Sequence, residues 1–406
     1  MAAAEMDRDG GLERVFADLH LHIGSTDAGQ PVKISASRDL TFHRIAQEAS
    51  GRKGIRLLGV IDAHAPGVQA DIARLLDSGE MAEIAGGGIR YRDVTLLLGS
   101  EIEIREEGRA PAHYLVYLPD LAAMRSLTDW MSKRMRNINL SSQRLYAGGR
   151  VLQEEIRGRG GLFIPAHIFT PHKGLFGSSA DRLPDVLDPA SVDGAELGLS
   201  ADTEMAGYLP DLDTLPFLTN SDAHSLAKIG REYNALLMGE PSFAELRMAL
   251  KGLSGRRIAA NYGLNPKLGK YHRTSCLNCG TTLAEHDPPA VARCPQCGSE
   301  RIVRGVLDRI LALGEQSGRP APVVYGDRPP YVYQVPLEFV PGVGRRTMDK
   351  LLERFGTEMA VLHEASKEAL AACAGEQAAM LIDRARRGEL ALTAGGGGVY
   401  GRVGRE

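Results

Sequence analysis

Seven short apolar runs recur in the first 250 residues of this 406-residue chain, and amphipathic stretches with helical spacing separate most of them. The runs span 15–23, 55–61, 94–104, 112–118, 161–169, 194–199 and 215–220. The amphipathic stretches include 39–50, 121–137 and 143–159. Repeated strand–helix alternation is typical of parallel strands joined by crossover helices. The pattern therefore predicts an α/β fold for residues 1–260, as a closed barrel or an open doubly wound sheet.

Histidines and carboxylates stand at the ends of these runs, in the motifs DLHLH, DAH, GSE, PAH and SDAH. The residues are His20, His22, Asp62, His64, Glu101, His113, His167, Asp222 and His224. The ends of parallel barrel strands meet at one rim, and alternate strand residues face the same side, so these groups can share ions. A lone histidine at a strand end is more often structural, but this recurrence predicts a polynuclear metal centre. Imidazole with carboxylate suits zinc, manganese or iron.

Four of the five cysteines form two CxxC pairs with fourteen residues between the pairs: Cys276, Cys279, Cys294 and Cys297. This spacing predicts one structural zinc ion, which would supply the folding energy of a module too small for a hydrophobic core. Residues 251–310 hold ten Lys and Arg against four Asp and Glu, and Lys267, Lys270 and Arg273 belong to this basic excess. Such a patch suits a polyphosphate backbone. The module at 261–315 is therefore expected to be a structural staple or a DNA clamp.

A small, mainly helical unit is predicted within residues 316–406, after a Pro-rich linker. The text FVPGVGRRTMDKLLERFG, at 339–356, favours a helix-hairpin-helix-like element with an amphipathic helix over 347–355. Its glycines would let the turn approach a phosphate, beside basic side chains; the residues are Gly342, Gly344, Arg345 and Arg346. The alternative is an ordinary glycine-rich turn between packed helices. The glycine-rich tail at 392–403 is expected to be mobile or ordered only on binding.

Composition bears on the partners and location of the protein rather than on its activity. The formal net charge of −3 gives no global sign of nucleic-acid binding, so that role must rest on local patches. No stretch approaches the roughly 18–20 apolar residues of a membrane span, and the polar start has no secretory apolar region. We therefore expect no membrane association and a cytoplasmic, nucleoid-associated protein.

The ordered motifs resemble those of the polymerase-and-histidinol-phosphatase (PHP) family, which folds as a distorted (βα)7 barrel around three metals. The resemblance implies two or three divalent ions of zinc, manganese, magnesium or iron. His20, His22 and Asp222 would hold the first ion, and Glu101 would bridge to a second ion held by His113 and His167. The third ion would take His64 and His224, with Asp27 in the place of a further ligand. Asp222, Glu101, His20 and His22 would be the catalytic set.

The order of barrel, GLNPKLGKYHRTSCLNC, second CxxC pair and RPPYVYQVPLEFVPGVG resembles the endonuclease Q family over nearly the whole chain. That family nicks DNA 5′ of deaminated bases (uracil, hypoxanthine, xanthine) and of abasic sites. The implied partners are damaged DNA and replication or repair proteins such as a sliding clamp. Reading a lesion in a duplex implies flipping the base into a pocket. Residues near the ligand loops are the candidates: Phe169, Glu196, Ser200 and Tyr233 for the pocket, with Arg231 as a phosphate contact.

Two other classes of function stay open on the sequence. A histidinol-phosphatase-like enzyme for small molecules would share the barrel and use the C-terminal modules for assembly. A lesion-binding scaffold without catalysis would need a degraded metal site, whereas the ligand set here is intact. Nicking of damaged DNA against hydrolysis of a small phosphate ester discriminates these classes.

Overall fold

Strand β1 (Glu13–Leu21) lies between parallel and antiparallel neighbours in the computed structural model, which describes residues 11–283 and 292–404. It pairs in parallel with β2 (Leu57–Val60), which pairs in parallel with β5 (Val94–Ile104). Strands β6 (Ala112–Leu118) and β8 (Leu162–Pro165) follow in antiparallel pairing. On its other side β1 pairs antiparallel with β11 (Tyr233–Met238). The sheet is therefore mixed rather than parallel throughout.

Two short strands, β9 (Ala195–Glu196) and β10 (Phe217–Leu218), close the sheet into a distorted barrel. The amide of Asp193 donates to Phe163 O and that of Ile168 to Glu196 O, both over 2.9 Å, which joins β9 to β8. Beyond β10, Leu21 bridges to Ala223 and thereby returns the ring to β1. Seven strands thus form the ring, which confirms the predicted PHP-type barrel.

The expectation of parallel strands is wrong for β6. Only residues 105–111 connect β5 to β6, and a parallel crossover needs a dozen or more residues. A connection of seven residues can return the chain only as an antiparallel neighbour. The full register from Leu98 opposite Leu118 to Ile104 opposite Ala112 follows from it.

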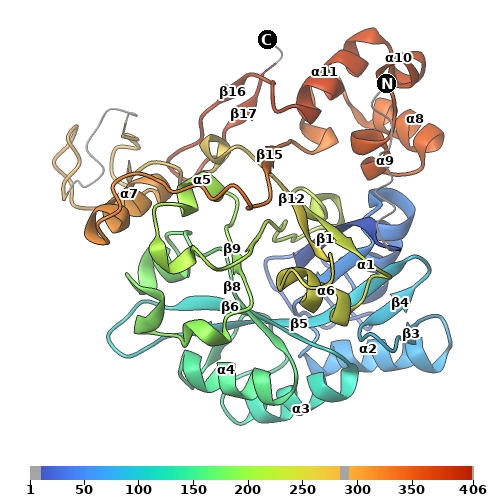
Figure 1. Cartoon of the computed structure of the whole chain (residues 1–406), viewed down its shortest axis with the longest axis horizontal. Helices are drawn as coiled ribbons and strands as arrows, with labels where there is room; N and C mark the ends of the chain where they lie inside the picture. Colours follow the sequence, from blue (N-terminus) through green and yellow to red (C-terminus); the bar gives the residue numbers. More distant parts are fainter. Residues whose placement is uncertain (1–10, 284–291, 405–406) are drawn as a thin grey trace.

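The predicted helical stretches are present with shorter bounds: α1 (Phe42–Glu48), α3 (Leu121–Ser132) and α4 (Gly149–Gly158). They cover the outside of the barrel together with α2 (Pro66–Asp77), and Figure 1 shows α3 and α4 below β5 and β6. Inside the barrel, apolar side chains from β1, β2, β5, β6 and β8 meet α6 (Phe243–Leu250) in one buried cluster. This cluster fills the barrel beneath the strand ends that carry the polar motifs.

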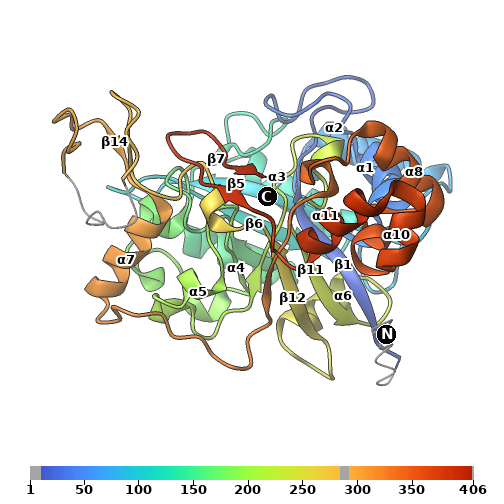
Figure 2. The same ribbon diagram turned by 90° about the horizontal axis from the view of Figure 1, so that it is seen from above.

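The C-terminal parts are built onto the barrel. Strand β12 (Arg257–Gly263) extends the sheet beyond β11, and β15 (Tyr331–Tyr333) pairs with β12 in parallel. The cysteine module, with β13 (Ser275–Cys276) and β14 (Ile302–Val303), precedes α7 (Val306–Gln316). It lies on the opposite side of the barrel from the helical unit (Figure 1, Figure 2). The predicted boundary at 260 therefore falls within β12, and β15 of the last unit joins the same sheet, while β13 and β14 form a sheet of their own.

The helical unit consists of α8 (Arg345–Phe355), α9 (Glu358–His363), α10 (Lys367–Ala374) and α11 (Glu376–Arg386). Before its glycine turn stands only a single 3-10 turn, Leu337–Phe339, where the expected hairpin would have a first helix. The unit packs on the barrel through Lys53, whose Nζ lies 3.0 Å from Glu358 Oε1. Both of these side chains are buried, so this ion pair belongs to the interface between the helical unit and the barrel.

The glycine-rich tail, which was expected to be mobile or ordered only on binding, forms a hairpin of β16 (Leu392–Thr393) with β17 (Arg402–Val403) in this structure. Amides of Gly395 and Gly401 donate to the carbonyls of Lys267 and Leu268 over 2.8 and 2.9 Å. A Cβ on Gly401 would lie 2.3 Å from Thr393 O. Glycine therefore serves close backbone approach here rather than mobility.

Glu232, beside β11, gives a prediction on stability. Its Oε1 accepts from the Leu264 amide (2.7 Å), and burial raises its pKa to about 8. The pKa of an unfolded glutamate is about 4.3. Between these two pKa values the folded state therefore keeps a proton that the unfolded state loses. The contribution of Glu232 to the free energy of unfolding therefore decreases as pH rises from about 4 to about 8. Glu232→Gln should therefore raise the melting temperature more at pH 8.5 than at pH 5.

Thermal unfolding of parent and variant at both pH values measures this difference. Glu154→Gln, at an exposed carboxylate on α4, is the control and should show no such pH dependence. Equal shifts of the Glu232 variant at pH 5 and pH 8.5 would show that Glu232 is ionised in the fold.

Candidate active site

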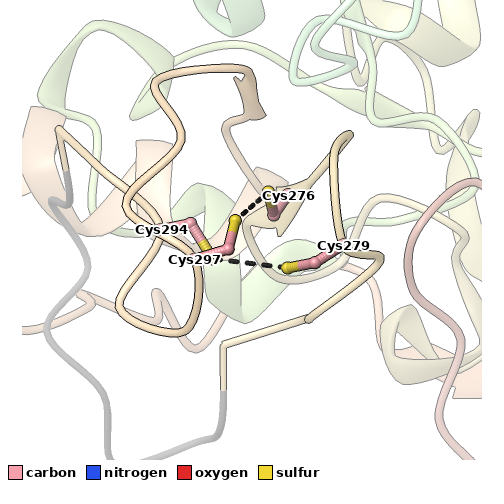
Figure 3. A group of neighbouring side chains, drawn as sticks. All are labelled: Cys276, Cys279, Cys294 and Cys297. Atoms are coloured by element: carbon pink, nitrogen blue, oxygen red, sulfur yellow. Dashed lines mark hydrogen bonds between the residues drawn. The ribbon is translucent and has the colours of Figure 1, made fainter.

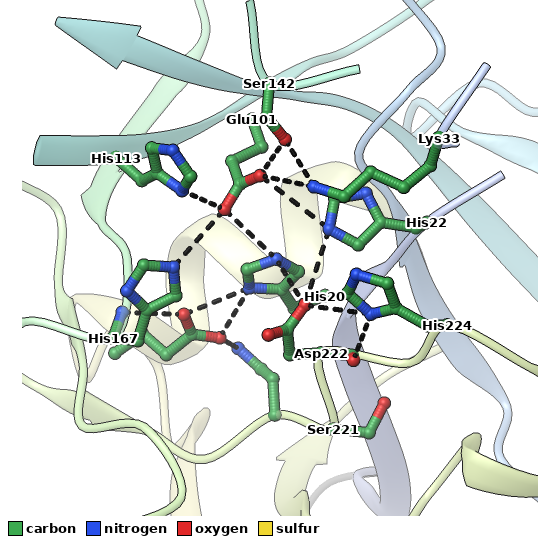
Figure 4. A network of polar contacts seen from close by, with 12 residues as sticks. His20, His22, Lys33, Glu101, His113, Ser142, His167, Ser221, Asp222 and His224 are labelled. Carbon is green, nitrogen blue, oxygen red and sulfur yellow. Dashed lines mark hydrogen bonds and ion pairs between the residues drawn. The ribbon is translucent and has the colours of Figure 1, made fainter. Parts of the chain in front are cut away.

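Ligand atoms from distant parts of the chain converge at one place (Figure 4). Three groups have their ligand atoms within 4.8 Å of one another. They are His20 with His22 and Glu101; His22 with Asp222 and His224; and Glu101 with His113 and His167. His22 and Glu101 each belong to two groups, which is the arrangement that adjacent ions with shared ligands require. The structure thus brings together seven of the predicted barrel ligands.

Two predicted ligands lie outside these groups. His64 has both ring nitrogens occupied, Nδ1 by Ser100 Oγ (2.9 Å) and Nε2 by Leu140 O (3.3 Å). Asp27 lies on an exposed loop, where its carboxylate accepts from Arg74 Nη2 (3.0 Å). In the described part of the chain the third group is therefore His22, Asp222 and His224 rather than the predicted set.

The histidines of β1 reach the centre because the strand is irregular. Val15, Ala17 and Leu19 face the barrel interior, so strict alternation would turn His20 outward. The register between β1 and β2 shifts between Asp18 and Leu21, at this point of the strand. The shift lets the histidines of the strand end join the carboxylates of other strands.

Buried carboxylates orient these two histidines. His20 Nδ1 lies 2.9 and 3.0 Å from the carboxylate oxygens of Glu196, and His22 Nδ1 lies 3.0 Å from Asp62 Oδ2. A carboxylate behind a ring fixes the tautomer and directs the other nitrogen at the metal. Glu196 therefore orients His20, and it also lines the cavity above the ligands, where it was predicted to line a base pocket. The sequence signal for Asp62 was its place in the DAH motif beside His64.

The charge and hydrogen bonding of the cluster fit divalent cations. Nε2 of His20 and Nε2 of His113 are buried and have no hydrogen-bond partner among the described residues. Burial alone would lower the pKa of His20, but Glu196, Asp222 and Glu101 raise it to about 10. Burial would likewise raise the pKa of Asp222, yet His20 and His22 hold it well below its usual range. The donor set therefore offers concentrated negative charge beside buried histidine nitrogens without hydrogen bonds, as ions of this kind require.

Two of the ligands sit on strained backbone. His167 has φ 29° and Asp222 has φ 46°, in the left-handed region that non-glycine residues seldom adopt. The neighbouring structure holds them there: His167 N donates to Glu196 Oε2 (2.8 Å), and Ala223 N donates to His20 O (3.1 Å). Strain of this kind concentrates at functional sites, where it fixes side-chain direction.

A cavity of about 380 Å³ opens above the ligands. Its lining includes Lys33, Lys173, Ser200, Lys270, Tyr271 and Tyr400. Ser200 was predicted to line a base pocket and Lys270 to contact DNA, whereas Lys33, Tyr271 and Tyr400 were not singled out. No periodicity in the sequence marks Tyr400, which reaches the cavity only because the tail folds back over 267–270.

Two other predicted pocket residues belong to the core. Phe169 is buried and stacks on Phe176 with ring centroids 6.0 Å apart. Tyr233 is buried, stacks on Tyr262 at 4.9 Å, and its hydroxyl lies 2.7 Å from His363 Nε2. Both rings are enclosed by packing, so neither is open to a ligand.

The residues predicted to contact phosphate also fall into two groups, those bonded within the protein and those exposed on its surface. Arg273 is buried against Asp308 (2.8 Å) and is structural, and Arg231 donates to Ser221 O (2.7 Å), next to Asp222. Lys267, Arg345 and Arg346 are exposed. Gly342, at φ 88°, and Gly344, the N-cap of α8, shape the turn that presents the two arginines.

The four cysteines gather their sulfurs as a zinc site demands (Figure 3). Cys276 Sγ lies 3.7 Å from Cys297 Sγ, and Cys279 Sγ lies 3.6 Å from Cys294 Sγ. Four thiolates at about 2.3 Å from a tetrahedral zinc lie about 3.8 Å apart. The cysteines are free thiols, so the geometry fits a metal rather than disulfides.

Comparison with known proteins agrees with this geometry. A family model described as PHP-associated matches residues 204–253. The uncharacterized protein YqxK of Bacillus subtilis (strain 168) is 51% identical over 397 residues, covering 97% of this chain and 100% of that protein. The crystal structure of the lesion-specific endonuclease PfuEndoQ from Pyrococcus furiosus matches with a TM-score of 0.82 and 32% identity. That match covers 96% of this chain and 95% of the other.

A second solved structure is Endonuclease Q in complex with a 27-mer duplex substrate that has an abasic lesion at the active site. It matches with a TM-score of 0.81 and 32% identity over 96% of both chains. The barrel and its ligand groups define a PHP-type metal-dependent hydrolase, the class predicted from the motifs. Within that class, the chain belongs to the endonuclease Q family. In the described residues, no helix has the length and apolar character needed to cross a bilayer.

Proposed function

We propose that this protein is a DNA-repair endonuclease that hydrolyses the phosphodiester bond 5′ of deaminated bases or abasic sites. The deaminated bases are uracil, hypoxanthine and xanthine. The observation that carries the proposal is the match, over nearly the whole chain, to a lesion-specific endonuclease, together with three intact ligand groups. The solved complex of the relative with an abasic duplex supports damaged DNA as the substrate.

The residues have distinct tasks in this proposal. His20, His22 and Asp222 would hold one ion, Glu101 with His113 and His167 would hold a second, and His224 with His22 and Asp222 would hold a third. Divalent ions at such groups supply hydroxide from bound water near neutral pH and neutralise charge on phosphate oxygens. Glu196 and Asp62 keep His20 and His22 in the tautomer that presents Nε2 to the centre. Lys33, Lys173 and Lys270 at the cavity attract the phosphate backbone.

Nicking of one labelled duplex with a single deoxyuridine, deoxyinosine or abasic site tests the proposal, with zinc, manganese, magnesium or iron supplied in turn. The undamaged duplex is the control, and a cut 5′ of the lesion is expected only in the damaged strand. Hydrolysis of p-nitrophenyl phosphate or histidinol phosphate without any nicking would favour the small-molecule phosphatase instead. Binding of damaged duplex without hydrolysis of either substrate would favour the scaffold.

The glycine turn before α8 gives a prediction on binding. Arg345 and Arg346 are exposed beside the amide end of that helix, where they can neutralise phosphates without reading bases. Replacing both with Ala should weaken binding of damaged and undamaged duplexes alike. The slope of log K against log salt should fall by about one to two, since about one counterion is released for each phosphate contact. Binding constants for both duplexes across a salt series measure these changes.

The matched control removes two exposed positive charges from the α3 region, Arg125→Ala with Lys133→Ala. In Figure 1 that helix lies at the far side of the barrel from α8. The control should leave the salt slope unchanged. If the α8 variant instead loses discrimination between the duplexes while its slope stays that of the parent, lesion recognition resides in the C-terminal unit.

A further inference from the structure

Ile34 is the most exposed large apolar side chain in the described part of the chain, at 80%. It occupies the second position of a β-turn, closed by the Ala36 amide donating to Lys33 O (3.0 Å). Turn corners favour Gly, Pro, Asn, Asp and Ser, each for a backbone reason that isoleucine does not share. Folding of this turn therefore does not account for a β-branched apolar residue in water.

The turn is fastened directly to the metal-binding backbone. The Lys33 amide donates to Ile23 O, next to His22, and the Ser37 amide donates to His224 O, each over 2.8 Å. Gly24 packs so closely that a Cβ there would lie 1.9 Å from Ser37 O. Ile34 is thus held at a set position relative to the ligand groups.

The two neighbours of Ile34 line the catalytic cavity. Lys33 and Ser35 both face it, and Lys33 Nζ lies 3.4 Å from Glu101 Oε2 and 2.7 Å from Ser142 Oγ. Ile34 therefore projects into solvent at the cavity mouth. Its chain neighbours are polar or small, so this turn lacks the contiguous apolar area typical of a protein interface.

We propose that Ile34 is a wedge that enters the base stack of duplex DNA where the damaged nucleotide leaves it. The inference rests on the proposed function and adds the group that opens the duplex. A nucleotide that enters the cavity leaves a gap between two base pairs, and isolated apolar side chains fill such unstacked steps. The lysines beside the turn draw the phosphates towards the ligands, which brings the stack against Ile34.

The test compares Ile34→Ala, which removes the wedge, with Ile34→Leu, which keeps apolar bulk. Single-turnover nicking is measured on a deoxyuridine duplex and on the same strand without its complement, where no stacked pair must open. We expect Ile34→Ala to nick the duplex at least tenfold more slowly and the single strand within threefold of the parent. Ile34→Leu should stay within threefold of the parent on both substrates.

A matched control is Leu253→Ala, another exposed apolar residue, 49% exposed, next to the start of β12. Through β11, the register places that start level with the first residues of β1, at the opposite end from His20 and His22. This variant should nick both substrates as the parent does. Equal slowing of duplex and single strand by Ile34→Ala would overturn the wedge, because the loss would then lie in folding or chemistry.

A second readout does not depend on nicking. A 2-aminopurine placed beside the deoxyuridine reports unstacking by a rise in fluorescence when saturating protein binds in EDTA. The parent and Ile34→Leu should raise the signal several-fold, and Ile34→Ala should not. A parent that raises the signal without nicking would refute the proposed activity but keep the wedge. A fluorescence rise with Ile34→Ala equal to that of the parent, or no rise with the parent, would refute the wedge. If the parent self-associates in solution and Ile34→Ala does not, Ile34 would belong to a contact between copies of the chain and the wedge would also be refuted.

Discussion

Asp222→Asn should lower the rate of phosphodiester cleavage on the order of a thousandfold or more, a loss of about 4 kcal/mol of transition-state stabilisation. Asp222 Oδ1 lies 3.5 Å from His20 Nε2 and 3.4 Å from His22 Nε2, so the carboxylate lies within reach of an ion held by either histidine. The amide keeps the shape of the side chain but removes the charge that holds the ions. Single-turnover nicking measures the rate, and fluorescence anisotropy in EDTA should show nearly unchanged DNA binding.

Asp27→Asn is the matched control, because both positions are aspartates of the predicted ligand set. The structure places Asp27 against Arg74, away from the ligand groups, so this variant should nick within about threefold of the parent. A large loss with Asp27→Asn would return Asp27 to the third ion. Nicking by Asp222→Asn at the rate of the parent would remove Asp222 from the metal centre.

Cys276→Ser combined with Cys279→Ser should release about one zinc ion per chain and unfold the module around it. Among the described residues of the module, the short strands β13 and β14 share two residue pairs, so the metal is expected to hold the two CxxC turns together. Metal analysis of the purified protein measures the zinc content. Limited proteolysis with mass spectrometry should show new cleavage between 274 and 304.

Cys373→Ser is the control, since Cys373 lies on α10, outside the four-cysteine group. It should keep both the zinc content and the proteolytic pattern of the parent. Unchanged zinc in the double variant would exclude a four-cysteine site, and loss of zinc without new cleavage would show that the module folds without its metal.

The sequence by itself determined the class of the fold and most of the ligands. Alternating runs and helical stretches predicted an α/β fold, as a barrel or an open sheet, because side-chain periodicity of two or 3.6 is a local property. The resemblance of the motifs to the PHP family then implied the barrel. The spacing of Cys276, Cys279, Cys294 and Cys297 predicted their cluster, since a CxxC turn brings its own sulfurs together. The HxH and SDAH motifs predicted ligands because barrel strand ends share a rim.

Only the tertiary structure decided which of the polar residues work together. Glu196 orients His20 across 176 residues, while His64 turns to Ser100 and Asp27 to Arg74. Tyr400 reaches the cavity through contacts of the tail with residues 267–270. Ile34 is placed at the cavity mouth by hydrogen bonds from the Lys33 amide to Ile23 O and from the Ser37 amide to His224 O. Local patterns specify which residues end a strand, but the partner of a side chain depends on strand register, irregularities such as the shift in β1, and long-range closure. Those are set by packing of the whole chain, so no spacing along the sequence encodes them.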